Sequence, residues 1–152
     1  MQTKVDDIKK LRKKTGAGIA DCRKALEEAG GDFDRAQELL KSWGIDKAAK
    51  KAGRAVGAGL VETYIHADSR IGAMIEVNCE TDFVARTNEF KNLAHELSMQ
   101  VAAMDPSTVE ELLRQEYIRD SSKTVEELVK EVIAKVGENI VIKRFMRFEL
   151  GE

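Results

Sequence analysis

The chain of 152 residues is 43% hydrophobic and 34% charged and holds a single proline, which is typical of a folded, helix-rich protein of one or two small domains. No stretch approaches the roughly 18 consecutive apolar residues of a membrane span, and the polar start MQTKVDDIKKLRKK lacks the apolar core of an export signal, so we expect a cytoplasmic protein with no membrane partner. The formal net charge of −2 argues against a dedicated nucleic-acid binder.

Three amphipathic helices are expected in the N-terminal third of the chain. Thr3 and Asp6 cap the first helix, the glycines of the TGAG sequence separate it from the second, and Gly30-Gly31 ends the second. Asp32 caps the third helix and Gly44 ends it. These helices predict a small bundle. Its core is expected to hold Val5, Ile8, Leu11, Ile19, Cys22, Leu26, Ala29, Phe33, Ala36, Leu39, Leu40 and Trp43.

The sequence DKAAKKAGRAVGAGL connects this bundle to the rest of the chain. Its alanines and lysines predict a helical extension to about residue 52, and its closely spaced glycines predict a flexible joint. We therefore expect a helical domain at 1–52, a linker at 53–59 and a second domain at 60–152. Residues 1–54 hold 14 Lys and Arg against 9 Asp and Glu, whereas residues 55–152 hold 11 against 18. This asymmetry suggests that the two parts meet different surfaces, although solvated charge would also produce it.

The connecting sequence is basic, and two interpretations of its charge remain open. It could contact RNA, or its side chains could be solvated. The second is favoured, because specific RNA readers pair such charge with stacking aromatic residues and none lies within the segment. The basic residues are Lys47, Lys50, Lys51 and Arg54.

Three strands are expected in the second domain. LVETYIHA and RIGAMIEVNC form a hairpin across the polar turn Asp68-Ser69. In the second of these strands, alternate residues from Ile71 to Cys79 share one face. The last strand, NIVIKRFMRFEL, is expected to place Val141 and Phe145 on one face. Its other face is expected to hold Ile140, Ile142, Met146, Phe148 and Leu150.

Helical patterns lie between these strands. One helix is expected from about Asn88 to Met104, and a weaker, acidic one from Val109 to Tyr117. Thr124 and Glu127 predict a capping box that begins a further helix, which Gly137 ends. This order predicts an α+β fold, in which helices cover one face of a three-stranded antiparallel sheet.

The opposite face of such a sheet is left without helices. Tyr64, Met74 and one side of the last strand are expected to lie there. Such an apolar remainder is either a contact surface for a second copy or another protein, or a scatter of surface apolar residues.

No pattern of residues predicts a catalytic site. His66 and His95 are isolated in a strand and a helix, and the sequence lacks a GxxxxGK phosphate loop. Cys22 and Cys79 have no metal-type spacing and are expected to be buried small side chains of a protein from a reducing compartment. We therefore expect no enzymatic activity, no metal and no cofactor.

Four segments occur in the order found in a known family: LRKKTGAGIADCRKAL, KAAKKAGR, VNCETDFVAR and KVGENIVIKRFMRFELG. With them the chain resembles the elongation factor Ts family, whose N-terminal domain is a ubiquitin-associated-like (UBA-like) three-helix bundle. The resemblance implies guanine-nucleotide exchange on the GTPase elongation factor Tu, in which the factor disturbs the Mg²⁺ site, expels GDP and lets GTP enter. The segment implied to enter the G domain of elongation factor Tu is Thr81, Asp82, Phe83 and Val84.

The resemblance also implies that the N-terminal domain docks on the G domain through its first helix and the TGAG turn. The matching positions are Arg12 and Ile19; family members often carry methionine near Ile19, so this contact is expected to be reduced. The segment between Met104 and Thr124 is short, and the chain has one sheet, which resembles the short, single-core form of the family. Since short forms can dimerise through the sheet, a homodimer is expected.

Two alternatives remain open. From the residues alone, Phe83 is expected to fold inward and fill the gap between sheet and helix, whereas the resemblance implies that the ring is held outside for the partner. The whole chain could instead be a ribosome- or RNA-associated adaptor without exchange activity, and its binding would then weaken steeply with added salt.

Overall fold

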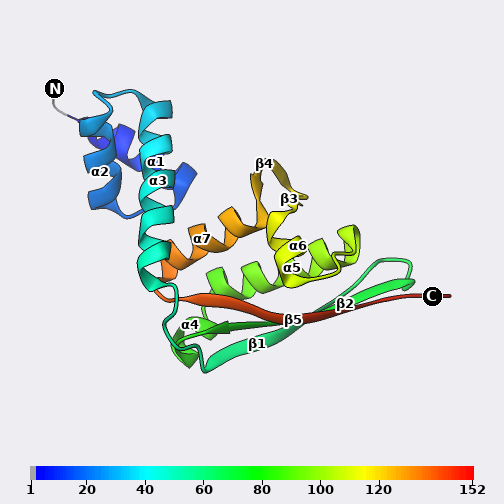
Figure 1. Ribbon diagram of the computed structural model, residues 1–152. Coiled ribbons are helices and arrows are strands. Elements are labelled where there is room, and N and C mark those ends of the chain that lie inside the picture. Colours follow the sequence, from blue (N-terminus) through cyan, green and yellow to red (C-terminus); the bar gives the residue numbers. More distant parts are fainter. Residues whose placement is uncertain (1–2) are drawn as a thin grey trace. The chain divides into compact units, whose positions relative to one another are not determined.

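The computed structural model describes residues 3–152, which form seven helices and five strands (Figure 1). Residues 1 and 2, which begin the predicted domain at 1–52, lie outside the described part. The chain divides into two compact units, Met1–Lys50 and Lys51–Glu152. Among the helices of residues 3–152, none has both the length and the apolar content needed to cross a membrane.

The N-terminal unit is the predicted bundle of three helices, α1 (Val5–Thr15), α2 (Ile19–Glu28) and α3 (Phe33–Lys51). α1 ends at Gly16, whose φ of 70° lies in the left-handed region that glycine adopts without strain. As predicted, Asp32 caps α3, since its carboxylate accepts a hydrogen bond from the N–H of Arg35 at 3.0 Å. The buried core consists of Leu11, Cys22, Ala25, Leu26, Ala29, Ala36 and Leu40.

Several details of this unit differ from the sequence prediction. Lys4, not Thr3, is the residue before α1, and no side chain caps this helix. Val5 and Ile19 are exposed, because each stands in the first turn of its helix, at the rim of a small core. α3 continues through Gly44, which does not take a positive φ; a glycine inside a helix costs only about 1 kcal/mol.

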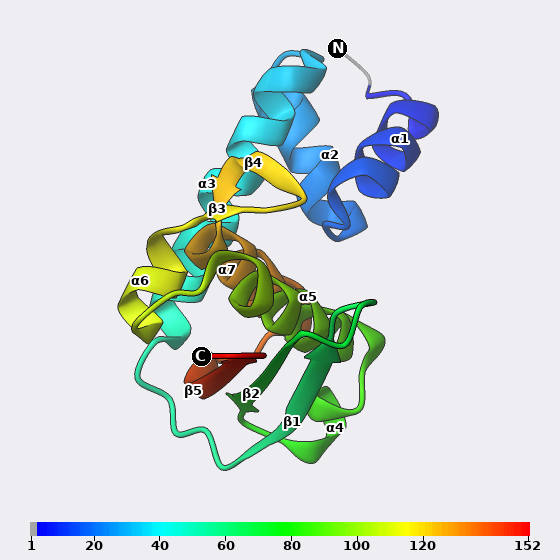
Figure 2. The ribbon, with the colours of Figure 1, turned by 90° about the vertical axis from the view of Figure 1, so that its right-hand side faces the viewer.

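The C-terminal unit is built on an antiparallel sheet in the order β1 (Ala58–Ile65), β2 (Ile71–Cys79) and β5 (Ile140–Glu149). Helices α5 (Asn88–Met104), α6 (Val109–Arg114) and α7 (Val125–Val136) all lie on the same side of it (Figures 1 and 2). The predicted α+β class is therefore confirmed.

The capping box predicted for α7 is present. The N–H of Thr124 donates to the Glu127 carboxylate at 3.1 Å, and the N–H of Glu127 donates to the Thr124 hydroxyl at 3.2 Å. Gly137 ends the helix with a φ of 77°, as the sequence predicts.

A small hairpin of β3 (Glu116–Tyr117) and β4 (Asp120–Thr124) was not predicted, and α6 is correspondingly shorter than the helix expected up to Tyr117. The fully buried Gln100 of α5 explains the difference. Its amide donates to the Glu116 carbonyl and accepts from the Ile118 N–H, both at 3.0 Å. A buried amide needs such partners, so this long-range contact favours extended backbone over another helical turn.

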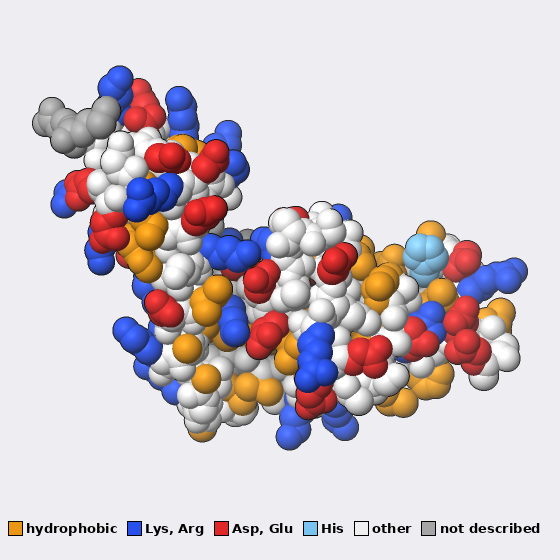
Figure 3. Space-filling model, turned by 45° about the horizontal axis from the view of Figure 1, so that its top comes forward, with side chains coloured by type: hydrophobic (Ala, Val, Ile, Leu, Met, Phe, Trp, Pro, Cys, Tyr) orange, Lys and Arg blue, Asp and Glu red, His pale blue; other side chains and the backbone are white. Residues whose placement is uncertain are grey.

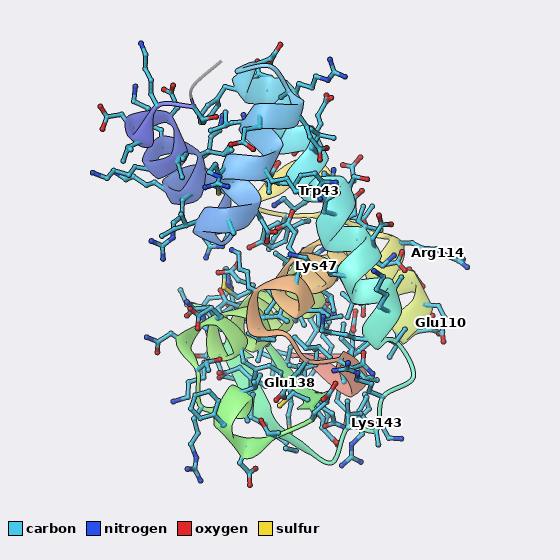
Figure 4. All side chains as sticks on the ribbon, turned by 90° about the vertical axis from the view of Figure 1, so that its left-hand side faces the viewer. Trp43, Lys47, Glu110, Arg114, Glu138 and Lys143 are labelled. Carbon is cyan, nitrogen blue, oxygen red and sulfur yellow. The ribbon has the colours of Figure 1, made fainter. Side chains whose placement is uncertain are left out.

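The predicted alternation along the last strand is wrong beyond Ile142. The register of β2 and β5 shifts between Glu76 and Val77, which face Arg144 and Ile142, so Lys143 is an extra residue that forms a β-bulge (Lys143 is labelled in Figure 4). Because strand faces alternate with a period of two, one extra residue exchanges the faces of everything that follows.

The bulge therefore gives the sheet a different open face from the one expected. Phe145 lies on the helix-covered face, whereas Val141 shares the open face with Met146 and Phe148. Tyr64 also lies on the covered side, where its ring meets that of His95 in α5 edge-on. We call the following exposed side chains the open apolar face: Val61, Ile65, Met74, Met146 and Phe148.

Candidate functional site

The TDFV segment forms one turn of helix, α4 (Asp82–Ala85), immediately after β2. Thr81 is its N-cap: the hydroxyl oxygen accepts a hydrogen bond from the N–H of Val84 at 3.3 Å. The start of the turn is thus set by a local contact, in which a threonine side chain bonds to the N–H of the residue three positions later.

Phe83 points away from the protein and is 80% exposed. On the other face of α4, the neighbouring Val84 and Ala85 are buried and anchor the turn to the C-terminal unit. The inward alternative for Phe83 is therefore wrong, because Val84 takes the buried position in this turn and the aromatic ring buried at the start of α5 is that of Phe90. An exposed phenyl ring on a fixed turn suits insertion into an apolar recess of another molecule.

The turn is joined to the end of α7 by a carboxylate that the sequence analysis did not single out. Glu138 accepts hydrogen bonds from the N–H groups of Glu80 and Thr81, at 3.1 and 3.0 Å, and from the Thr81 hydroxyl at 2.7 Å. In return, Glu80 accepts from the N–H of Asn139 at 2.9 Å. Glu138 lies 57 residues from Thr81, so no local pattern could have revealed this contact.

Cys79 lies under the same segment, fully buried at the end of β2. Its thiol donates to the Thr81 carbonyl at 3.2 Å. Burial raises the pKa of the Cys79 thiol, and the nearby carboxylate of Glu138 raises this pKa further. Both cysteines are free and buried, as predicted, and a thiol with a raised pKa is a poor nucleophile.

Residues 3–152 contain no group of three or more His, Cys, Asp or Glu side chains able to hold a metal ion. What the Phe83 turn presents is an apolar ring flanked by the exposed side chains of Asp82 and Arg86. Such a surface can bind a partner and alter the partner's conformation.

The residues expected to contact a partner from the N-terminal unit, Arg12 and Ile19, are both exposed. Arg12 lies in the last turn of α1, and Ile19 begins α2, where its side chain is 59% exposed. Acidic and basic side chains are interspersed over this unit in the view of Figure 3.

Two of the basic residues considered as RNA contacts are engaged in ion pairs within their own units. Lys47 of α3 lies 2.6 Å from the carboxylate of Asp21 in α2. Arg54 lies 3.6 Å from the carboxylate of Glu80. Both pairs reduce the positive charge that this segment offers to a phosphate backbone.

Comparison with known proteins identifies the family. A sequence model described as Elongation factor TS matches residues 80–152, which include the Phe83 turn and Glu138. Curated relatives named Elongation factor Ts match from Thermoanaerobacter sp. (45% identical, covering 95% of this chain and 93% of the relative), Coprothermobacter proteolyticus (41%, 100% of both) and Thermotoga petrophila (44%, 100% and 98%).

The first two of these alignments extend over 190 and 197 residues, more than the 152 of this chain, so the relatives carry residues that have no counterpart here. The identity nevertheless extends over nearly the whole sequence, including both compact units. The chain belongs to the elongation factor Ts family of translation elongation factors.

Proposed function

We propose that the protein is the guanine-nucleotide exchange factor of elongation factor Tu, acting in the cytoplasm without a catalytic site of its own. The observation that carries this proposal is the 80% exposed ring of Phe83, held out on a capped turn at the end of β2. In the proposed complex, Thr81, Asp82, Phe83 and Val84 form the segment that meets the G domain and disturbs its Mg²⁺ site.

The physical requirement on an exchange factor is differential binding. A GTPase holds its nucleotide through phosphate contacts and Mg²⁺, which neutralises the phosphate charge. An exchange factor that prefers the nucleotide-free, distorted partner lowers the affinity of that partner for nucleotide. Bound nucleotide must then lower the affinity of the partner for the exchange factor by the same ratio. Burying the ring of Phe83 only in the distorted state would contribute about 1.5–3 kcal/mol, a shift of about tenfold or more.

The N-terminal unit supplies the second contact in this proposal. Arg12 can donate hydrogen bonds to a carboxylate or carbonyl of the G domain, and Ile19 can cover an apolar position. Both side chains are exposed near the turn between α1 and α2. The proposed complex includes no direct contact with nucleic acid, because Lys47 and Arg54 are already engaged in ion pairs.

We further propose that two copies associate through the open apolar face. The sheet register makes this face continuous across three strands, because Met74 stands opposite Met146 while Gly72 stands opposite both Ile65 and Phe148. A contiguous apolar surface of this kind is typical of a protein contact, and one patch can serve both copies about a two-fold axis.

The test of exchange is stopped-flow release of a fluorescent GDP analogue from elongation factor Tu. The wild-type protein should accelerate release at substoichiometric concentration, and Phe83→Ala should reduce this acceleration about tenfold while the thermal unfolding midpoint stays nearly unchanged. The matched control is Ile118→Ala, which truncates an exposed apolar side chain in the β3–β4 hairpin and should leave exchange intact. Release that the wild-type protein does not accelerate would overturn the proposal.

A further inference from the structure

Glu138 directly follows Gly137, the residue that ends α7, and its carboxylate reaches the segment between β2 and α4. Figure 4 shows the labelled Glu138 between α7 and α4. Both carboxylate oxygens are used: one accepts from the N–H groups of Glu80 and Thr81, and the other from the Thr81 hydroxyl. Hydrogen bonds to an ionised acceptor are roughly twice as strong as neutral ones.

The hydroxyl of Thr81 connects this carboxylate to α4. Because its proton is donated to Glu138 at 2.7 Å, its lone pairs remain for the N–H of Val84 at 3.3 Å. The Thr81 carbonyl is engaged as well, since it accepts from the Cys79 thiol and from the N–H of Ala85, both at 3.2 Å. Every polar group of Thr81 is thus held by a partner.

The contact is reciprocal. The carboxylate of Glu80 accepts from the N–H of Asn139 at 2.9 Å and lies 3.6 Å from the guanidinium of Arg54. The Asn139 amide in turn donates to the Arg54 carbonyl at 2.9 Å. Two glutamates, each accepting from the backbone of the other's segment, therefore join the end of β2 to the start of β5. We call these contacts of Glu80 and Glu138 the crossed brace.

A turn as short as α4 needs such support. It has four residues, and an isolated helix of one turn is unstable because nucleation fixes several residues for a single hydrogen bond. An exposed phenyl ring also lowers the free energy of the chain when it folds back onto apolar side chains of the same protein, because apolar surface is then removed from water. The crossed brace opposes both tendencies because it fixes the backbone immediately before Phe83.

We infer that Glu138 is a positioning residue for exchange: through Thr81 it holds the Phe83 turn in the one orientation that a partner can accept. This inference rests on the proposed function. Without the carboxylate, the turn populates other conformations, and the fraction of molecules with a correctly placed ring falls. A smaller competent fraction lowers the effect on the partner even though Glu138 itself does not touch the partner.

The test compares Glu138→Ala and Glu138→Gln with a control at the opposite end of the same helix. Glu127→Ala removes the glutamate of the capping box. Like Glu138, Glu127 accepts a hydrogen bond from a backbone N–H, but it lies at the start of α7, far from the Phe83 turn. Glu138→Ala should lower the maximal rate of accelerated GDP release about fivefold, less than the loss expected for Phe83→Ala, because a fraction of the molecules still places the ring correctly. Glu127→Ala should leave the rate unchanged, and Glu138→Gln, which keeps one acceptor oxygen, should fall between.

Two further measurements separate positioning from general destabilisation. In a double-mutant cycle, Glu138→Ala should have no additional effect on release once Phe83 is alanine, because the ring it positions is gone. In the free protein, hydrogen exchange of the Glu80, Thr81 and Val84 amides should accelerate in Glu138→Ala while amides in the middle of α7 keep their protection.

Three results would overturn the inference. These are a Glu138→Ala rate equal to that of Glu127→Ala, a loss that simply adds to that of Phe83→Ala, and unchanged protection of the Thr81 and Val84 amides. Failure of the proposed function gives a different result, because Phe83→Ala would then have no effect on GDP release. The amide exchange of the free protein would still show whether Glu138 holds the turn.

Discussion

Replacing Phe148 with alanine should weaken the proposed dimer and leave the fold of a single copy nearly unchanged. Phe148 lies near the end of β5 on the open apolar face, opposite Gly72 of β2, and 69% of it is exposed in one chain. Its ring therefore makes few contacts that stabilise the monomer. Its main effect on free energy should come from a surface that covers it.

The size of the effect follows from the exposed fraction. Complete burial of a phenylalanine side chain is worth about 1.5–3 kcal/mol, so covering the part of Phe148 that is still exposed gains about 1–2 kcal/mol. A two-fold symmetric contact uses the residue twice. The substitution should therefore cost the dimer about 2–4 kcal/mol, which raises its dissociation constant about 30- to 700-fold.

Sedimentation velocity over a range of protein concentrations measures this constant for the wild-type protein and for Phe148→Ala. The matched control is Phe83→Ala, since Phe83 is similarly exposed but does not belong to the sheet, and its removal should leave the dimer intact. A wild-type protein that sediments as a monomer, or a Phe148→Ala dimer as stable as the wild type, would refute the assignment of the open face.

Two predictions concern the stability of the C-terminal unit. Gly59→Ala should lower the free energy of unfolding by about 1–3 kcal/mol, because a Cβ at its φ of 145° would lie 2.2 Å from the Val77 carbonyl oxygen; in urea unfolding, Gly57→Ala is the control, since a Cβ there meets nothing within 4 Å. Arg147→Ala should cost about 1.5–3 kcal/mol, because this side chain is only 12% exposed and donates to a carbonyl in the last turns of α5 at 3.0 Å. Arg144→Ala removes an ion pair whose arginine is 79% exposed and should change stability by less than about 1 kcal/mol, and equal losses for the two arginines would contradict this reasoning.

Local signals account for much of what could be predicted. The glycines at 16 and 137 end helices because each takes a positive φ, and the Thr124–Glu127 capping box begins α7 with contacts only three residues apart. The α+β class, the β1–β2 hairpin and the main helices follow from hydrophobic periodicity, which the chain carries residue by residue. Such features need no knowledge of distant partners.

Contacts between distant segments decided what the periodicity could not. The bulge at Lys143 is defined only by pairing with β2, and it reversed the faces of the second half of β5. The β3–β4 hairpin depends on the buried amide of Gln100, which lies in α5 and is separated from the hairpin by α6. These two differences from the prediction therefore arise from partners that lie elsewhere in the chain.

Contiguous residues are enough to identify the family and to place the TDFV segment at the end of a strand. The outward direction of Phe83 and the hydrogen bonds of Glu138 to Thr81 emerge only from the folded chain. A side chain is buried or exposed according to the space that its neighbours leave. Here Val84 takes the buried position in the turn, and the brace comes from a residue 57 positions away from Thr81.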